Sequence, residues 1–298
     1  MNQNSKNNSN LKKLIDIGRA LSREKDIDIL LEKILLEAKS ISNSDGGTVY
    51  LISDDNKKLS FKIIRTDSLN FKWGGSEAPV PDSIYPVRIY QEDGTANKHN
   101  VVSLCAIENK TINIKDAYTD TRFDFSGTKG FDEKYSYRSK SFLNVPLKNH
   151  KDKVIGVLQL LNAQKDGEII SFSQELENLI EALASQASVA LTNQLLIDEQ
   201  KTLFRSFIKL VAEALEQKDQ ATGGHCNRVP VLTMMIAEAI NLDKADGFKD
   251  FSFTEDELDE LYVAGWLHDF GKVATPEHIM NKSTKLEGLY DKIDEIKF

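Results

Sequence analysis

The chain has 298 residues, of which 40% are hydrophobic and 28% charged, and its formal net charge is −8. This length accommodates two domains of ordinary size, and the composition is typical of a soluble globular protein. The acidic balance argues against a nucleic-acid-binding surface, and no apolar run is long enough to predict a membrane span. Only two cysteines are present, Cys105 and Cys226, which argues against a disulfide framework and favours a reducing cytoplasm.

The first segments of the chain predict a tail followed by helices. Residues 1–10 (MNQNSKNNSN) are polar and lack the apolar core of a signal peptide, so we expect a disordered tail. Residues 11–41 carry apolar side chains at helical spacing. A break near Ser22–Asp28 divides this region into two amphipathic helices.

The apolar period then changes, and strand-forming residues follow. Residues 46–53 and 58–65 favour two strands joined by the turn-forming sequence DDNK. A short helix is predicted over 101–110, and further strands are predicted at 111–117, 141–149 and 153–163. Helices that flank a largely antiparallel sheet make this part an α+β domain.

A long helix without Gly or Pro is predicted from Ser171, which with Gln174 fits a capping box, to about Asp219. Alternating steps of four and three residues along it give a mostly apolar stripe, made of Leu176, Ile180, Leu183, Ala187, Ala190, Gln194, Ile197, Lys201, Phe204, Ile208, Val211 and Leu215. The stripe predicts a homodimer through a parallel coiled coil over residues 173–218, with the polar Gln194 and Lys201 fixing the register. The alternative is that the same helix packs on its own domains.

Two further helices are predicted after the glycines at 223 and 224, over residues 225–242 and 254–273. His225 opens the first of them. Thr254 and Glu257 form a capping box for the second, which delivers His268 and Asp269. Imidazoles and a carboxylate that converge from different helices can bind divalent metal. The alternative is a histidine at a helix end beside a capping aspartate.

The sequences KDQATGGHCNRV (218–229) and GWLHDFGKVATPEHIMNKSTKLE (265–287) together resemble the first half of an HD-GYP-type domain, a subclass of the HD phosphohydrolases. The resemblance implies that His225, His268 and Asp269 are metal ligands. It also implies that Asp269 bridges two divalent ions, such as Fe or Mn, and that Lys272 contacts the scissile phosphate. The substrate implied is a cyclic dinucleotide such as cyclic di-GMP.

Two neighbouring residues have simpler interpretations, and the later part of the family pattern is missing. Cys226 is expected to pack in the interior, and His278 to be a surface or structural histidine. The family's further ligands and its Gly-Tyr-Pro signature have no match after Asp269. We therefore expect residues 219–298 to be a partial HD-GYP-type domain that ends inside the catalytic domain, binds metal weakly and hydrolyses little or nothing.

The sequences FDEKYSYRSKSFLNVPLKNHKDKVIGVLQLLNAQ (131–164) and FSQELENLIEALASQASVALTNQLL (172–196) resemble a GAF domain, which we place at residues 11–172. The resemblance implies a six-stranded antiparallel sheet with a ligand pocket on one face and dimerising helices on the other. A small-molecule ligand is implied, but the residues do not identify it.

Several residues bear on the identity of that ligand. Asn162 and Phe172 match part of the set found in cyclic-nucleotide-binding GAF domains, but Ala163 stands in place of the lysine. This departure puts cyclic-nucleotide binding in doubt. Cys105 is expected to be a core residue rather than a bilin attachment site. The basic side chains either meet an anionic ligand or are solvated surface charges; they are Arg122, Arg138 and Lys140.

Two functional hypotheses follow. The first is a cytoplasmic signalling protein in which a GAF sensor controls, through the long helix, a metal-dependent cyclic-dinucleotide phosphodiesterase. The second is a non-enzymatic dimeric GAF regulator whose helical HD remnant serves as an interaction surface.

Overall fold

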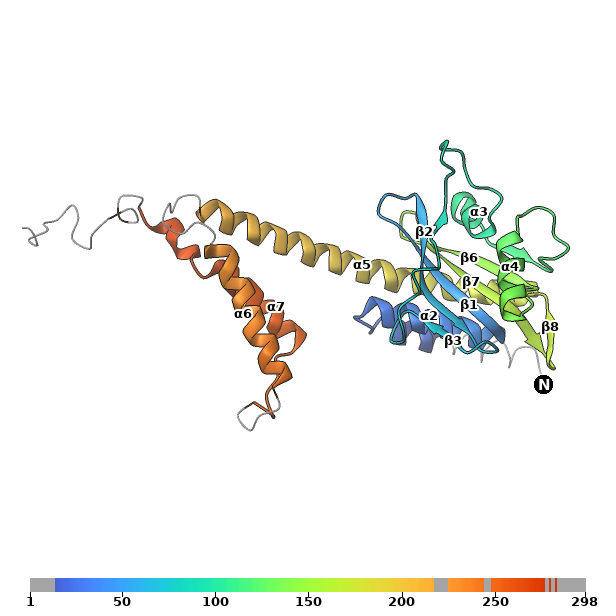
Figure 1. Cartoon of the computed structure of the whole chain (residues 1–298), viewed down its shortest axis with the longest axis horizontal. Helices are drawn as coiled ribbons and strands as arrows, with labels where there is room; N and C mark the ends of the chain where they lie inside the picture. Colours follow the sequence, from blue (N-terminus) through green and yellow to red (C-terminus); the bar gives the residue numbers. More distant parts are fainter. Residues whose placement is uncertain (1–13, 217–224, 244–247, 277–278, 280–281, 283–298) are drawn as a thin grey trace, which may run out of the picture. The chain divides into compact units, whose positions relative to one another are not determined.

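A computed structural model describes residues 14–216, 225–243, 248–276, 279 and 282 (Figure 1). The chain forms two compact units, Met1–Ile197 and Asp198–Phe298. The predicted fold class is confirmed: an antiparallel sheet with flanking helices is followed by a long helix and a helical region. Among the described helices, none is both long and apolar enough to cross a membrane.

The first unit is built on one eight-stranded antiparallel sheet. Its strands are β1 (Ser44–Ile52), β2 (Lys58–Thr66), β3 (Phe71–Trp73), β4 (Val87–Arg88), β5 (Ile112–Ile114), β6 (Phe142–Lys148), β7 (Val154–Lys165) and β8 (Glu168–Ile170). The main path runs β3-β2-β1-β7-β6-β5, while β4 pairs with β2 and β8 with β7. The predicted strands correspond to β1, β2, β5, β6 and β7, and the short strands β3, β4 and β8 were not predicted.

Both faces of this sheet are buried. Along β1, Val49 and Leu51 belong to one hydrophobic cluster while Tyr50, between them, belongs to the other. This alternation follows from the opposite orientation of successive side chains in a strand. The helical segment 14–21, α2 (Ile27–Ser42) and the first part of α5 (Gln174–Glu216) supply the first cluster. Helix α3 (Val101–Glu108) and Phe125, which precedes α4 (Ser126–Tyr135), supply the second.

Helix α2 lies directly on strand β1. Asp26 begins the helix, because its side chain accepts a hydrogen bond from the backbone N–H of Ile29 at 2.9 Å. A Cβ atom at Gly47 would lie 2.7 Å from Leu35 Cδ1 and 2.9 Å from the Gln159 carbonyl oxygen. The missing side chain therefore lets α2 pack against the centre of the sheet.

Helix α5 begins two residues later than the predicted capping box. The Ser173 hydroxyl accepts from the backbone N–H of Leu176 at 3.3 Å, so Ser173 caps the helix and the predicted role of Ser171 with Gln174 is wrong. Phe172 explains the shift, because its side chain is buried in the first cluster and holds the chain outside the helix up to that point. Ile180, Leu183, Ala187 and Ala190 of the predicted stripe are buried in the same cluster.

The second unit contains α6 (His225–Leu242), α7 (Glu255–Leu267) and the 3-10 helix η1 (Phe270–Ala274). The predicted capping box of Thr254 and Glu257 at the start of α7 is confirmed. The Asn241 side chain accepts from the Phe253 N–H at 2.7 Å and donates to the Phe253 carbonyl at 3.0 Å. These two bonds fasten the start of α7 to the end of α6.

A buried ion pair joins α2 to strands β2 and β3. The Arg65 guanidinium donates to Glu32 Oε1 at 2.6 Å and to the carbonyls of Trp73 and Gly74 at 2.7 and 2.9 Å. Glu32 Oε2 accepts from the Ser76 hydroxyl at 2.7 Å. Burial raises the pKa of Glu32, but the hydrogen bonds from Arg65 and Ser76 outweigh burial and lower it from 4.5 to about 2.

We predict that Glu32→Gln lowers the free energy of unfolding at pH 7 by about 2–4 kcal/mol, because it leaves the Arg65 charge buried without its partner. Glu32 has a lower pKa in the folded chain, so its contribution is complete above pH 4.5 and is lost as the pH falls toward 2. The difference between wild type and variant should shrink over that range. Urea titrations over that pH range, followed by Trp73 fluorescence in a Trp266→Phe background, measure this difference in the free energy of unfolding of the first unit.

The matched control is Glu92→Gln, which removes the exposed Arg88–Glu92 pair. This control should leave the urea midpoint unchanged. An equal loss in both variants, or a pH-independent loss in Glu32→Gln, would contradict the role assigned to the buried pair.

Candidate metal centre

The predicted metal ligands of the second unit come together at the ends of two helices. His225 is the first residue of α6. His268 is the residue at which α7 ends, and Asp269 directly precedes η1. Each ligand therefore stands where a helix begins or ends, and α6 and α7 pack on each other over many residues.

The distances between the donor atoms suit one divalent cation. His225 Nε2 lies 3.2 Å from His268 Nε2, and His268 Nε2 lies 3.3 Å from Asp269 Oδ2. One donor atom from each of the three residues lies within 4.8 Å of the others. Ligands that each lie about 2.1 Å from one ion are about 3.0–3.4 Å apart in tetrahedral or octahedral geometry, so both measured separations fit. The residues could therefore hold a metal ion.

The imidazole of His268 is held in one orientation. Its Nδ1 lies 2.8 Å from the carbonyl oxygen of Gly265. Because a carbonyl only accepts, Nδ1 carries the proton in this hydrogen bond, and the lone pair of the neutral ring is on Nε2. Metal-binding histidines are commonly oriented by such a bond from the other ring nitrogen. The arrangement turns Nε2 toward His225 and Asp269.

Lys272 lies beside Asp269, one turn further along the chain. Its Nζ donates to Asp269 Oδ2 at 2.7 Å. This hydrogen bond, followed by the positive charges around it, holds the pKa of Asp269 below its usual value. Asp269 is therefore a carboxylate at neutral pH and offers negative charge to a cation. The side chains of His268 and Asp269 are both about one quarter exposed, so the group is accessible from solvent.

Two further residues near this site were considered in the sequence, Cys226 and His278. Cys226 is buried, as predicted, and its backbone N–H donates to Glu216 Oε1 at 3.3 Å. His278 lies outside the residues that the structure describes. The convergence of His225, His268 and Asp269 was predicted from sequence. The contact between Gly265 and the His268 ring was not, because it depends on how α7 ends.

In the first unit, Asn162 has a structural environment. Its Oδ1 accepts from the backbone N–H groups of Lys140 and Ser141, and its Nδ2 donates to the Tyr137 hydroxyl and the Arg138 carbonyl. Asn162 is fully buried and has a positive φ of 55°. Its amide thus ties strand β7 to the segment that connects α4 with β6. All four hydrogen bonds are to the protein itself.

The remaining ligand candidates of the first unit divide between core and surface. Phe172 and Cys105 are core residues, and burial raises the pKa of the Cys105 thiol well above its usual value. Arg122 is exposed and pairs with Asp120, while the Arg138 guanidinium lies 3.9 Å from the ring centroid of Tyr118. Arg138 and Lys140 contact Asn162 through their backbone carbonyl and N–H groups.

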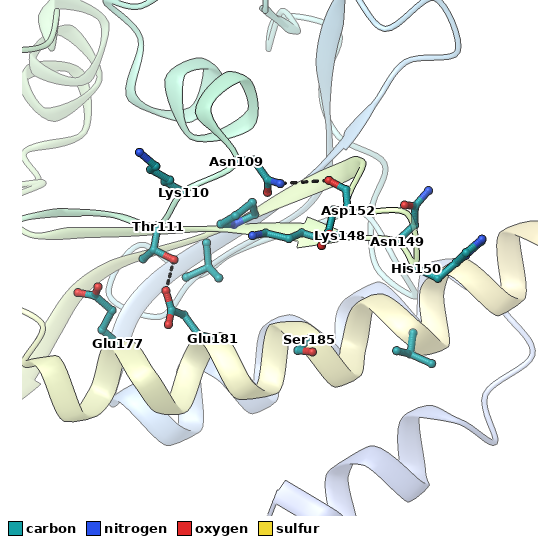
Figure 2. A pocket seen from close by; sticks show the side chains of 13 residues that line it. Asn109, Lys110, Thr111, Lys148, Asn149, His150, Asp152, Glu177, Glu181 and Ser185 are labelled. Atoms are coloured by element: carbon teal, nitrogen blue, oxygen red, sulfur yellow. Dashed lines mark hydrogen bonds between the residues drawn. The ribbon is translucent and has the colours of Figure 1, made fainter.

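A groove that sequence reasoning missed runs between the sheet edge and α5, and Figure 2 shows it from close by. Its volume is about 760 Å³, and its walls combine Lys110 and Lys148 with Glu177 and Glu181 of α5. Glu181 accepts from the Thr111 hydroxyl, and the Asn109 side chain donates to the Asp152 carbonyl at 3.0 Å. The lining residues come from segments far apart in the chain, so no local sequence pattern indicates the groove.

Comparisons with known proteins agree with both units. The model of the GAF domain matches residues 26–191, and the model of the HD domain matches residues 222–296. Among curated proteins, the cGMP-specific 3',5'-cyclic phosphodiesterase of Drosophila erecta is 28% identical over 156 residues, 51% of this chain and 13% of that protein. The enzyme of the same name from Drosophila virilis is 28% identical over 151 residues, 50% of this chain and 15% of that protein.

The matched part is therefore a small fraction of those phosphodiesterases.

Among solved structures, the GAF domain of an Acinetobacter phosphoenolpyruvate-protein phosphotransferase has a TM-score of 0.46 and 16% identity, and covers 64% of this chain and 98% of that one. A GAF domain/HD domain protein from Geobacter sulfurreducens has a TM-score of 0.40 and 14% identity, and covers 59% and 98%. The matches to the two family models show that the chain belongs to the GAF domain family and carries an HD domain after its GAF domain.

Proposed function

We propose that the chain is a GAF-coupled phosphohydrolase whose HD domain binds a divalent metal through His225, His268 and Asp269. The observation that carries the proposal is the spacing of the three donors, 3.2 and 3.3 Å between neighbouring atoms. Similarity to proteins named cGMP-specific 3',5'-cyclic phosphodiesterase supports the same reaction class. In this proposal the GAF domain binds a small-molecule signal that controls the HD domain.

The chemistry divides between the cation and the residues of the chain. A bound divalent ion such as Fe or Mn would supply a Lewis acid and an activated water for attack on a phosphodiester. His268, oriented by the Gly265 carbonyl, and the carboxylate of Asp269 would hold that cation in place. The Lys272 ammonium neutralises charge on a phosphoryl oxygen. As the resemblance to HD-GYP-type domains implies, the carboxylate of Asp269 would also serve a second divalent ion.

For the substrate we propose a cyclic dinucleotide of the cyclic di-GMP type. The support is the residue pattern around His225 and from Gly265 to Lys272, which resembles the HD-GYP type of HD domain. Cyclic GMP is the appropriate comparison substrate, because the curated relatives are named for it.

We predict that the purified chain binds Mn²⁺ and that His268→Ala or Asp269→Asn weakens binding at least about 10-fold, because each removes one of the three donors. Isothermal titration and metal analysis after gel filtration measure this. His150→Ala, which removes an exposed histidine of the first unit, is the control and should bind as wild type does. Equal binding by His268→Ala would rule out this centre.

The sequence predicts low phosphodiester turnover for this chain, and that turnover is what the next variant tests. We predict that Lys272→Met retains Mn²⁺ but lowers the wild-type kcat/KM by about a further 10- to 100-fold, because the transition state loses a cation. Product chromatography with cyclic di-GMP and cyclic GMP measures the rate and the preference. A chain that loads Mn²⁺ and turns over neither substrate would favour the non-enzymatic regulator. Turnover of cyclic GMP alone would refute the proposed substrate but not the metal centre.

We also propose that the chain forms a homodimer through α5, with a stripe different from the one the sequence first indicated. The first part of that stripe, from Ile180 to Ala190, is buried in the core of the first unit. The exposed apolar residues of α5 include four that recur every seven positions: Val189, Leu196, Leu203 and Leu210. A seven-residue repeat is the period of a coiled coil, which buries such side chains against a second copy.

We predict that Leu196→Glu with Leu203→Glu converts the dimer to a monomer, because charges at the seam would be buried against each other. Sedimentation velocity measures the change. Thr202→Glu is the matched control, since it adds a charge at an exposed position about 100° around the helix from Leu203. Loss of the dimer in the control as well, or a wild type that is monomeric, would contradict the proposed seam.

A further inference from the structure

Helix α7 packs tightly against α6 at Gly265. A Cβ atom at this position would lie 3.0 Å from the Cα of Pro230, 3.4 Å from its Cβ and 3.6 Å from its Cγ. Carbon atoms in good contact are separated by about 3.5–4.0 Å, so a methyl group at this position would displace the backbone of α6 by a few tenths of an ångström. Gly265 and Pro230 are both buried, so the contact lies in the interior between the two helices.

This contact is near the histidine pair on both helices. Pro230 is five residues after His225 in α6, and Gly265 is three residues before His268 at the end of α7. At 1.5 Å per residue, both separations are about 4–8 Å along the helix axes. Any increase in the distance between the helices at this contact is therefore passed to the two imidazoles.

The same glycine also sets the direction of one imidazole. Its carbonyl oxygen lies 2.8 Å from His268 Nδ1 and directs Nε2 to within 3.2 Å of His225 Nε2. Gly265 thus controls two quantities, the separation of the helices and the orientation of the ring. Metal–ligand distances tolerate changes of only about 0.2 Å, which makes the centre sensitive to both.

We propose that Gly265 is a positioning residue of the metal centre: its missing side chain lets α6 and α7 approach until His225 and His268 share one cation. The inference rests on the proposed metal-binding function and assigns no contact between Gly265 and the metal. It identifies which residue of the GWLHDFGKV sequence brings the histidines together. The second glycine of that sequence, Gly271, has a different environment, because a Cβ there would meet nothing within 4 Å.

The test compares Gly265→Ala with Gly271→Ala in the full chain, using Co²⁺ as the probe. Affinity is measured by titration, and coordination geometry by the visible absorption of the bound ion. Alanine favours a helix more than glycine does, so Gly265→Ala should not weaken α7 through its intrinsic propensity. We expect at least about 10-fold weaker Co²⁺ binding and an altered absorption band for Gly265→Ala, and binding within about twofold of wild type for Gly271→Ala.

Two variants of α6 extend the test in case Gly265→Ala alters the fold, which far-ultraviolet circular dichroism without metal reveals. Pro230→Val adds a branch next to the contact from the other helix and should weaken Co²⁺ binding as Gly265→Ala does. Pro230→Ala keeps the Cα and Cβ atoms and should preserve binding.

Wild-type affinity in folded Gly265→Ala or Pro230→Val would overturn the inference alone. An equal loss in Gly271→Ala would do the same, since it would show that any change at either glycine disturbs the centre. A wild-type chain that binds no Co²⁺ would overturn the proposed function and this inference together.

Discussion

Burial of the central strands on both faces is the constraint on which the first unit depends. Strands β1 and β7 lie in the middle of the sheet and send alternate side chains into two separate clusters. Each face must therefore be covered, by α2 and α5 on one side and α3 on the other. The close approach at Gly47, the cap at Asp26 and the tether at Asn162 all serve to hold covering segments onto that sheet.

In the second unit, the positions of the candidate metal ligands depend on where helices begin and end. They do not depend on how a sheet is covered. A capping box starts α7, and Asn241 fastens that start to α6. The opposite end of α7 then presents His268 and Asp269 toward His225. Three partly exposed donors and a neighbouring ammonium form a small polar centre, whereas the groove of the first unit is wide and has walls of mixed charge.

Sequence alone predicted what depends on periodicity and on short motifs. Strand-forming residues on both sides of the turn sequence DDNK identified β1 and β2, and the pairing of His225 with His268 and Asp269 identified the donor group. The short edge strands β3, β4 and β8 carry too few residues for a period to be visible. The start of α5 depends on the burial of Phe172, and the exposed face of that helix depends on which residues its own domain covers. Neither can be deduced from local spacing. The same holds for the contact of Gly265 with Pro230, which requires two helices to be placed.

The Arg65–Glu32 pair has a consequence for how this sequence can vary. Arg65 uses a planar fork to reach a carboxylate and backbone carbonyls at once, and lysine has no equivalent geometry. Changing either partner alone leaves a buried charge without compensation. Positions 32 and 65 lie 33 residues apart on different elements. We therefore expect them to change together in related sequences. The replacement that we expect to keep the fold stable changes both residues to apolar side chains that fill the same space.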